Sequence, residues 1–341
     1  MYIENKRIKK YLSNWLLLMF ILISIIIIVG GLTRLTDSGL SITQWELFSG
    51  VLPPLTEIKW NHYFNLYKKI PEFELQNHSM SLKDFKVIFW WEFIHRFLGR
   101  LIGILFLLPL VYFSFKIGLN RTKNLFYIFF LICFQGFIGW YMVSSGLVDR
   151  IDVSHYRLSL HLVLAFIILS LIYWNYLNCN EITHPKITIG YILPLIFLIL
   201  LFVQIAIGAF VSGMDAGLIY NTWPLMGMSY FPNDNSIINL FKLSVFNDPS
   251  LVQFIHRNLA YLILFIYFVI LFKIYLNKLI FFTKIISIIG FLLLLQIILG
   301  VLILLSGANI FICSMHQISS IFLVSSSIYL LYLNFNLQPL N

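Results

Sequence analysis

The sequence is divided into apolar runs that are long enough to cross a lipid bilayer. A membrane helix needs about 20 predominantly apolar residues, and helices are favoured there because each satisfies its own backbone hydrogen bonds. The predicted spans cover residues 15–30, 91–115, 124–145, 156–177, 187–211, 251–275, 281–305 and 311–333. We therefore predict an all-α integral membrane protein with about eight transmembrane helices.

Composition and charge support this class of protein. The chain is 60% hydrophobic and 11% charged, whereas a soluble domain is about half apolar and a quarter charged. The net charge of +9 is concentrated near the ends of the apolar runs, which indicates orientation in a membrane rather than binding to nucleic acid. Bases at the N-terminus, in short loops and at Lys186 predict that these parts face the cytoplasm. Residues 34–89 and 212–250 then form two external segments.

The chain also contains an internal repeat. One block recurs 178 residues later (208 − 30): Gly30, Asp37, Gly39, Leu40 and Trp45 match Gly208, Asp215, Gly217, Leu218 and Trp223. A second recurs after 161 residues (296 − 135): Gln135, Gly139, Ser145 and Gly146 match Gln296, Gly300, Ser306 and Gly307. Each half contains four predicted spans, so both halves share one orientation, as in a parallel repeat. We predict two four-helix bundles, residues 1–178 and 187–341.

Four histidines recur in this pattern, each near the start of an apolar run: His95, His161, His256 and His316. The span count places all four near the outer ends of their helices. Imidazoles in hydrocarbon are costly, and they often mark a functional site. Two imidazoles at one depth suit axial ligation of haem iron inside a helix bundle. Zinc needs three or four ligands, and no third ligand recurs in both halves. Helix packing is the alternative for any single histidine.

The repeat breaks beside the first histidine of each half. Glu92 lies three residues before His95, whereas Gln253 lies three residues before His256. Residues three apart share a helix face, and a carboxyl group can transfer protons where an amide cannot. We therefore expect chemistry in the first half and electron transfer or a structural haem in the second. A helix-end position that favours an acid is the alternative for Glu92.

Three arginines are candidates for binding haem propionates. Arg157 lies one turn before His161 on the same helix face. Arg96 and Arg257 directly follow histidines, although adjacent helix residues point about 100° apart. Charge-assisted hydrogen bonds to carboxylates suit this role. Snorkelling of the charged head group toward lipid head groups is the alternative for each.

In the motifs around these histidines, Glu92 and the arginines, the chain resembles the haem A synthases, which are membrane enzymes of cytochrome oxidase assembly. Seven blocks carry the resemblance and span nearly the whole chain in order. They are Gly30-Gly-Leu-Thr-Arg-Leu-Thr-Asp-Ser-Gly-Leu-Ser41, Glu92-Phe-Ile-His-Arg-Phe-Leu-Gly-Arg100, Gln135-Gly-Phe-Ile-Gly-Trp140, Ser154-His-Tyr-Arg-Leu-Ser-Leu-His161, Asn221-Thr-Trp-Pro-Leu225, Phe254-Ile-His-Arg257 and Met315-His-Gln317. Residues 34–89 lack the cysteine pair of some bacterial members, so the chain is similar to the proteobacterial and mitochondrial branch.

The resemblance implies an oxidoreductase that converts a methyl group of haem O to a formyl group, through successive hydroxylations, to give haem A. It implies that His95 and His161 flank the substrate haem with Glu92 beside it, and that His256 and His316 ligate a resident haem b. We expect hand-over from haem O synthase within the membrane and an electron donor that the sequence does not name. No targeting extension precedes the first predicted helix, so we expect a bacterial inner membrane.

Two other classes of protein remain open. A di-haem b-type electron carrier or quinol dehydrogenase would use the same four histidines but would not need the difference between Glu92 and Gln253. A transporter built from two parallel repeats would bind no haem tightly and would have helices broken at mid-membrane. Its matching breaks are absent, because Pro109 and Pro194 do not occupy equivalent places in the two halves.

Overall fold

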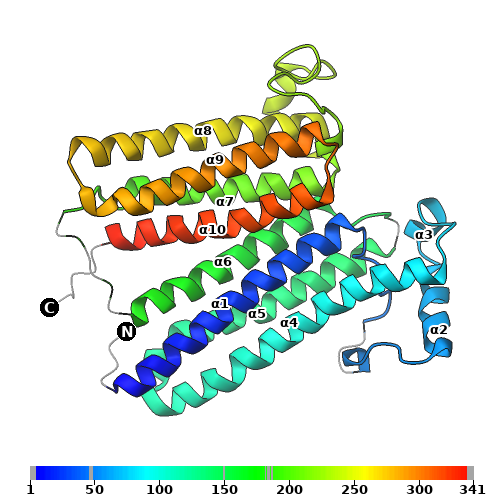
Figure 1. Cartoon of the computed structure of the whole chain (residues 1–341). Coiled ribbons are helices and arrows are strands. Elements are labelled where there is room, and N and C mark those ends of the chain that lie inside the picture. The colour runs from blue at the N-terminus through cyan, green and yellow to red at the C-terminus, as the bar shows by residue number, and fades with distance from the viewer. Residues whose placement is uncertain are drawn as a thin grey trace. The chain divides into compact units, whose positions relative to one another are not determined.

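The computed structural model describes residues 5–45, 49–148, 150–180, 182, 185 and 187–335, and Lys186 lies outside them. Within that part, eight helices are long and apolar enough to cross a membrane. They are α1 Lys6–Leu35, α4 Leu82–Ile117, α5 Leu119–Gly146, α6 His155–Cys179, α7 Ile192–Gly213, α8 Pro249–Leu276, α9 Thr283–Leu305 and α10 Ile310–Asn334 (Figure 1). The predicted all-α fold with eight spans is therefore confirmed.

Several helices extend beyond the apolar runs that predicted them. α1 begins after Asn5, whose side chain accepts hydrogen bonds from the backbone N–H groups of Arg7 and Ile8. α4 begins after Ser81, which forms a capping box with Asp84. These caps satisfy backbone donors at the helix start. Hydropathy marks only the part of a helix in hydrocarbon, so it missed the polar first turns of both helices.

The polar segment between α1 and α4 contains two short helices, α2 Glu57–Tyr67 and α3 Pro71–Leu75. They lie beside the start of α4 (Figure 1). The buried aromatic residues of α2, Trp60, Phe64 and Tyr67, belong to one core cluster with Phe85 and Phe89 of α4. Aromatic side chains bury a large area each, so this cluster attaches the polar segment to the end of the span that carries His95.

The polar segment between α7 and α8 contains three short 3-10 helices, η2 Ala216–Leu218, η3 Ile237–Phe241 and η4 Leu243–Asn247. It ends at Asp248, whose side chain accepts a hydrogen bond from the Leu251 N–H and caps α8. Within this segment the Asp234 carboxylate accepts hydrogen bonds from Tyr220 and Ser250. These bonds connect the middle of the segment to both of its ends.

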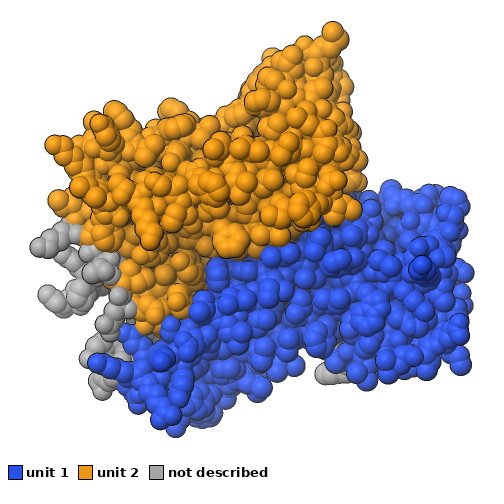
Figure 2. All heavy atoms as spheres, in the orientation of Figure 1, with its two compact units in different colours: residues 1–169 blue, residues 170–341 orange. Residues whose placement is uncertain are grey.

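The chain forms two compact units, Met1–Leu169 and Ser170–Asn341 (Figure 2). In the first unit α4 packs against α1 and α5; in the second, α7 packs against α8 and α10, and α10 against α9. The boundary falls inside α6, whose Trp174 packs against Tyr332 at the end of α10. The predicted functional division at the linker after residue 178 stays a prediction.

The repeat is also present in the backbone. Asp37 follows α1 with φ 46°, and Asp215 follows α7 with φ 49°. This left-handed conformation is uncommon for residues other than glycine. The same rare turn therefore ends the first long helix of both units, at positions that the sequence repeat aligns.

Candidate functional site

The first unit brings His95 of α4 and His161 of α6 together. Their ring centres lie 6.4 Å apart and the ring planes are at 74°. Two imidazoles bound to opposite sides of one metal ion, at about 2.0–2.1 Å from each nitrogen, have ring centres about 6 Å apart. The spacing therefore suits one metal ion held between the two rings.

The second unit contains the equivalent pair, His256 on α8 and His316 on α10. Within the described residues, no group of three or more His, Cys, Asp and Glu side chains could hold a metal ion. A pair of imidazoles in each unit matches the number of protein ligands in bis-imidazole ligation of haem.

Each histidine ring packs against a glycine of the preceding long helix. The pairs are Gly30 with His95, Gly139 with His161, Gly208 with His256 and Gly300 with His316. A Cβ atom on these glycines would lie 3.1, 3.0, 3.1 and 3.6 Å, respectively, from the nearest ring atom. The absence of a side chain lets the helix backbones approach the rings closely.

Three of the four imidazoles keep a buried nitrogen without a partner. Among the described residues, the Nδ1 atoms of His161, His256 and His316 are buried and accept or donate no hydrogen bond. Buried polar atoms normally have partners, and an exception calls for an explanation such as a bound ion. The orphaned nitrogens and the paired rings fit a haem iron in each unit.

The carboxylate of Glu92 is bound from three directions, by Ser41, Ile42 and Arg96. Its Oε2 accepts hydrogen bonds from Ser41 Oγ and Ile42 N, both at 2.7 Å. Its Oε1 pairs with Arg96 Nη2 at 2.5 Å. Glu92 is only 2% exposed, so the turn after α1 and the next turn of α4 together fix this carboxylate one turn from His95.

Gln253, which corresponds to Glu92 in the second unit, contacts the equivalent backbone residue, but it donates a hydrogen bond where Glu92 accepts one. Gln253 Nε2 donates to Tyr220 O at 3.1 Å, and Tyr220 is the repeat counterpart of Ile42 (42 + 178). Arg257 Nη2 donates to the same carbonyl at 3.0 Å. The second unit thus has no ionisable carboxyl group at this position, and its glutamine and arginine both donate to one backbone carbonyl.

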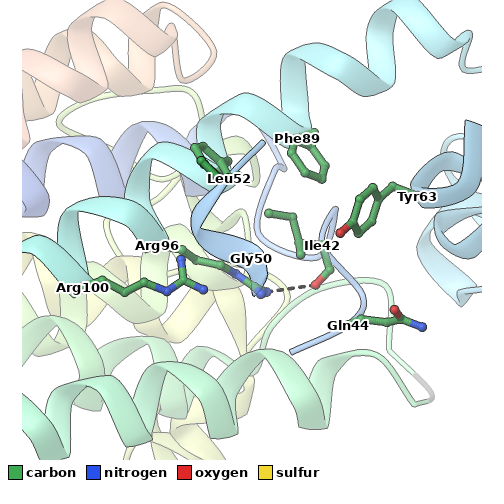
Figure 3. Close-up of a pocket in the computed structure, with 9 residues that line it drawn as sticks. Ile42, Gln44, Gly50, Leu52, Tyr63, Phe89, Arg96 and Arg100 are labelled. Carbon is green, nitrogen blue, oxygen red and sulfur yellow. Dashed lines mark hydrogen bonds between the residues drawn. The ribbon is translucent and has the colours of Figure 1, made fainter. Parts of the chain in front are cut away.

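The three predicted propionate-binding arginines all contact protein groups. Arg96 donates to Ile42 O at 2.9 Å, as the dashed line in Figure 3 shows, besides pairing with Glu92. Arg257 contacts Tyr220 O and Leu225 O. Arg157 donates to Ser145 Oγ and lies 4.7 Å from the centre of the Tyr141 ring. Propionate binding by these residues stays a prediction.

Sequence reasoning missed two features of this site. Ser41 binds Glu92, and its counterpart is Ile219 (41 + 178). This break in the repeat matches the change from Glu92 to Gln253 and was visible in the sequence. Three glutamines donate to histidine carbonyl groups on the next helix. The repeat aligns two of them, but no sequence pattern shows which backbone atom a glutamine contacts.

Comparison with known proteins identifies the family. Residues 13–328 match the family model described as cytochrome oxidase assembly protein. The chain is 50% identical to the haem A synthase of Pelagibacter ubique over 338 residues, which covers 98% of this chain and 100% of that protein. It is 42% identical to the haem A synthase of Rickettsia bellii, covering 94% and 97%, respectively. With this coverage, the chain belongs to the family of cytochrome oxidase assembly proteins.

Proposed function

We propose that this protein is a haem A synthase, which oxidises a methyl group of haem O to the formyl group of haem A. The single observation that carries the proposal is an asymmetry between equivalent sites. Both units hold a pair of histidines, but among the described residues only those of the first unit have a buried carboxylate beside them. Relatives with 50% and 42% identity over nearly their full length are haem A synthases, which supports the same reaction here.

The two units have different tasks in this proposal. His95 and His161 hold the substrate haem in the first unit, where successive hydroxylations of the methyl group take place. His256 and His316 hold a resident haem b in the second unit, which transfers electrons. When bound, haem iron supplies the redox chemistry, and the protein supplies binding, orientation and electrostatics.

Glu92 is the proposed proton-transfer group. A carboxyl group can take up and release a proton during the reaction, which the amide of Gln253 cannot. Ser41, Ile42 and Arg96 orient the carboxylate, and restricting a catalytic group in this way keeps it in a productive position. Arg96, Arg157 and Arg257 are the proposed partners of haem propionates.

We place the protein in a bacterial inner membrane, with the N-terminus in the cytoplasm and all four histidines toward the periplasmic side. The basic residues of the N-terminal region and short loops support this orientation. Substrate then arrives within the membrane from haem O synthase, and a separate donor delivers electrons to the protein.

The test is extraction and chromatography of the porphyrins bound to purified wild type and to Glu92→Gln, which gives the first site the side chain of the second. We expect haem A in the wild type. The variant should keep haem b but accumulate haem O or a partly oxidised porphyrin. Glu72→Gln is the matched control, because Glu72 is also buried in the first unit but belongs to α3. It should form haem A normally.

Other outcomes would contradict the proposal. A wild type that contains only haem b would favour a di-haem electron carrier. Normal haem A formation in Glu92→Gln would make Glu92 a structural partner of Ser41 and Arg96 without a role in the chemistry. A helix-end role is already excluded, because α4 begins at Leu82. A wild type without any haem would refute the four-histidine hypothesis itself.

A further inference from the structure

The same two-residue arrangement recurs on three helices. A glutamine is followed four residues later by a glycine at Gln135/Gly139 on α5, Gln204/Gly208 on α7 and Gln296/Gly300 on α9. In each case the glycine faces a histidine ring of the next long helix. The glutamine Nε2 donates to the carbonyl oxygen of the same histidine, at 2.9, 3.1 and 2.7 Å, respectively. We name this pair of residues the glutamine–glycine clamp.

Each clamp fixes a histidine at two points. The hydrogen bond ties the backbone of the histidine to the neighbouring helix, and the glycine limits where its ring can lie. Gln204 Nε2 also lies 3.3 Å from His256 Nε2, so this amide contacts the ring as well. A buried hydrogen bond of this kind is lost only at the cost of leaving its groups unsatisfied.

The fourth position has the glycine but not the glutamine. Gly30 of α1 faces the His95 ring, and the residue four places before it is Ile26, the repeat counterpart of Gln204 (26 + 178). The Ile26 side chain lies against Gly99, one turn after His95. An isoleucine side chain has no donor, so it cannot replace the missing amide.

We infer that Gln135, Gln204 and Gln296 are positioning residues that keep three axial histidines in place, and that Ile26 leaves His95 as the ligand that exchanges. This inference rests on the proposed function. A resident haem b benefits from two clamped ligands, as His256 and His316 are. A substrate haem has to enter and leave, which a single unclamped ligand allows.

Carbon monoxide tests the inference, because it binds a ferrous haem with two axial imidazoles only after one of them leaves. The readout is the rate of carbon monoxide binding to the reduced protein, followed by absorbance. In the wild type we expect one fast phase, from the haem held by His95 and His161. Ile26→Gln should slow that phase about threefold to tenfold, the range expected for one added hydrogen bond.

Two converse variants complete the design. Gln135→Ile should accelerate the phase of the first unit, and Gln204→Ile should create a second fast phase from the resident haem b. Ile26→Leu is the matched control and should bind carbon monoxide at the wild-type rate. If Ile26→Gln fails to fold, the two glutamine variants still test the clamp.

Wild-type rates in both Gln135→Ile and Gln204→Ile would overturn the inference. A fast phase that comes from the haem of the second unit in the wild type would also overturn it. The rates of carbon monoxide binding do not depend on product formation. Wild-type rates in these variants would therefore refute the inference even if the protein makes haem A. Conversely, a protein that contains only haem b would refute the proposed function. The effect of Gln204→Ile on carbon monoxide binding to the second unit could still be measured.

Discussion

The glycines that face the histidines differ in how much room they leave. A Cβ atom on Gly208 would lie 3.1 Å from His256 Cε1, which is tighter than ordinary contact, whereas on Gly300 it would lie 3.6 Å from His316 Cε1. The two sites belong to the same unit and hold the same pair of ligands. The two glycines therefore form a pair for comparison, because they face equivalent histidines with different clearance.

We predict that Gly208→Ala displaces the His256 imidazole and that Gly300→Ala leaves His316 in place. Overpacking of this kind costs about 1–3 kcal/mol. Gly208→Ala should shift the midpoint potential and the low-spin electron paramagnetic resonance signal of haem b, or lower its occupancy, while Gly300→Ala should resemble the wild type. Equal effects of both substitutions would contradict the clearance argument.

At the scale of single residues, the sequence identified ligand candidates better than their surroundings. The four histidines and Glu92 were visible because ionisable side chains are rare in apolar runs. The partners of Glu92 were not visible, because Ser41 and Ile42 lie about 50 residues away and reach it only after the turn folds back onto α4. A repeat reveals that two positions differ, but it does not reveal what each side chain contacts.

At the scale of elements, a buried acid of α3, Glu72, connects this helix to α2. Glu72 is 2% exposed, and its Oε1 accepts hydrogen bonds from Tyr67 at 3.0 Å and from Asn77 at 3.4 Å. Burial raises the pKa of Glu72 to about 8, against a usual 4.5, and the hydrogen bond from Tyr67 opposes this only in part. Burial and the neighbouring Glu72 also raise the pKa of Tyr67.

This pKa predicts that α2 and α3 become less stable as pH rises. The folded form binds a proton that the unfolded form releases above about pH 4.5, so the stabilising contribution is complete below pH 4.5 and is lost as pH rises toward about 8. The total is on the order of a few kcal/mol, because one pKa unit corresponds to about 1.4 kcal/mol. Hydrogen exchange of residues 57–77 between pH 5 and pH 8.5, corrected for intrinsic rates, measures it.

Glu72→Gln should remove this pH dependence, because the neutral amide does not titrate. Glu57→Gln, an exposed acid in the first turn of α2, is the control and should keep the wild-type pH profile. A Glu72→Gln profile as steep as that of the wild type would show that another group titrates.

The sequence predicted the number of membrane helices better than the residues at which they begin. The eight spans were predictable, because hydrophobic length determines whether a helix crosses a bilayer. The start of α4 was placed at residue 91 but lies at Leu82. Its first turns bury Phe85 and Phe89 against α2 rather than in lipid, so the prediction from membrane hydropathy began the helix too late.

At the scale of the whole molecule, each compact unit contains its own pair of histidines. We predict that His256→Leu abolishes the resident haem b and leaves porphyrin bound to the first unit, because His95 and His161 do not depend on it. Haem A should not form if electrons pass through the resident haem. Haem-to-protein stoichiometry and chromatography of the extracted porphyrins measure both effects.

His62→Leu is a suitable control, because His62 is an exposed histidine of α2. It should bind both porphyrins normally. Loss of all porphyrin from His256→Leu would contradict a separate site in each unit.

The connection between α4 and α5 has a consequence for how the chain enters the membrane. Gly118 alone joins these two long helices, with φ 89°, a conformation that suits glycine. With a single residue between them, the first of these spans cannot be released into lipid long before the second leaves the ribosome. We expect the translocation machinery to insert α4 and α5 together as one hairpin, so that His95 reaches the bilayer already joined to the helix that will support His161.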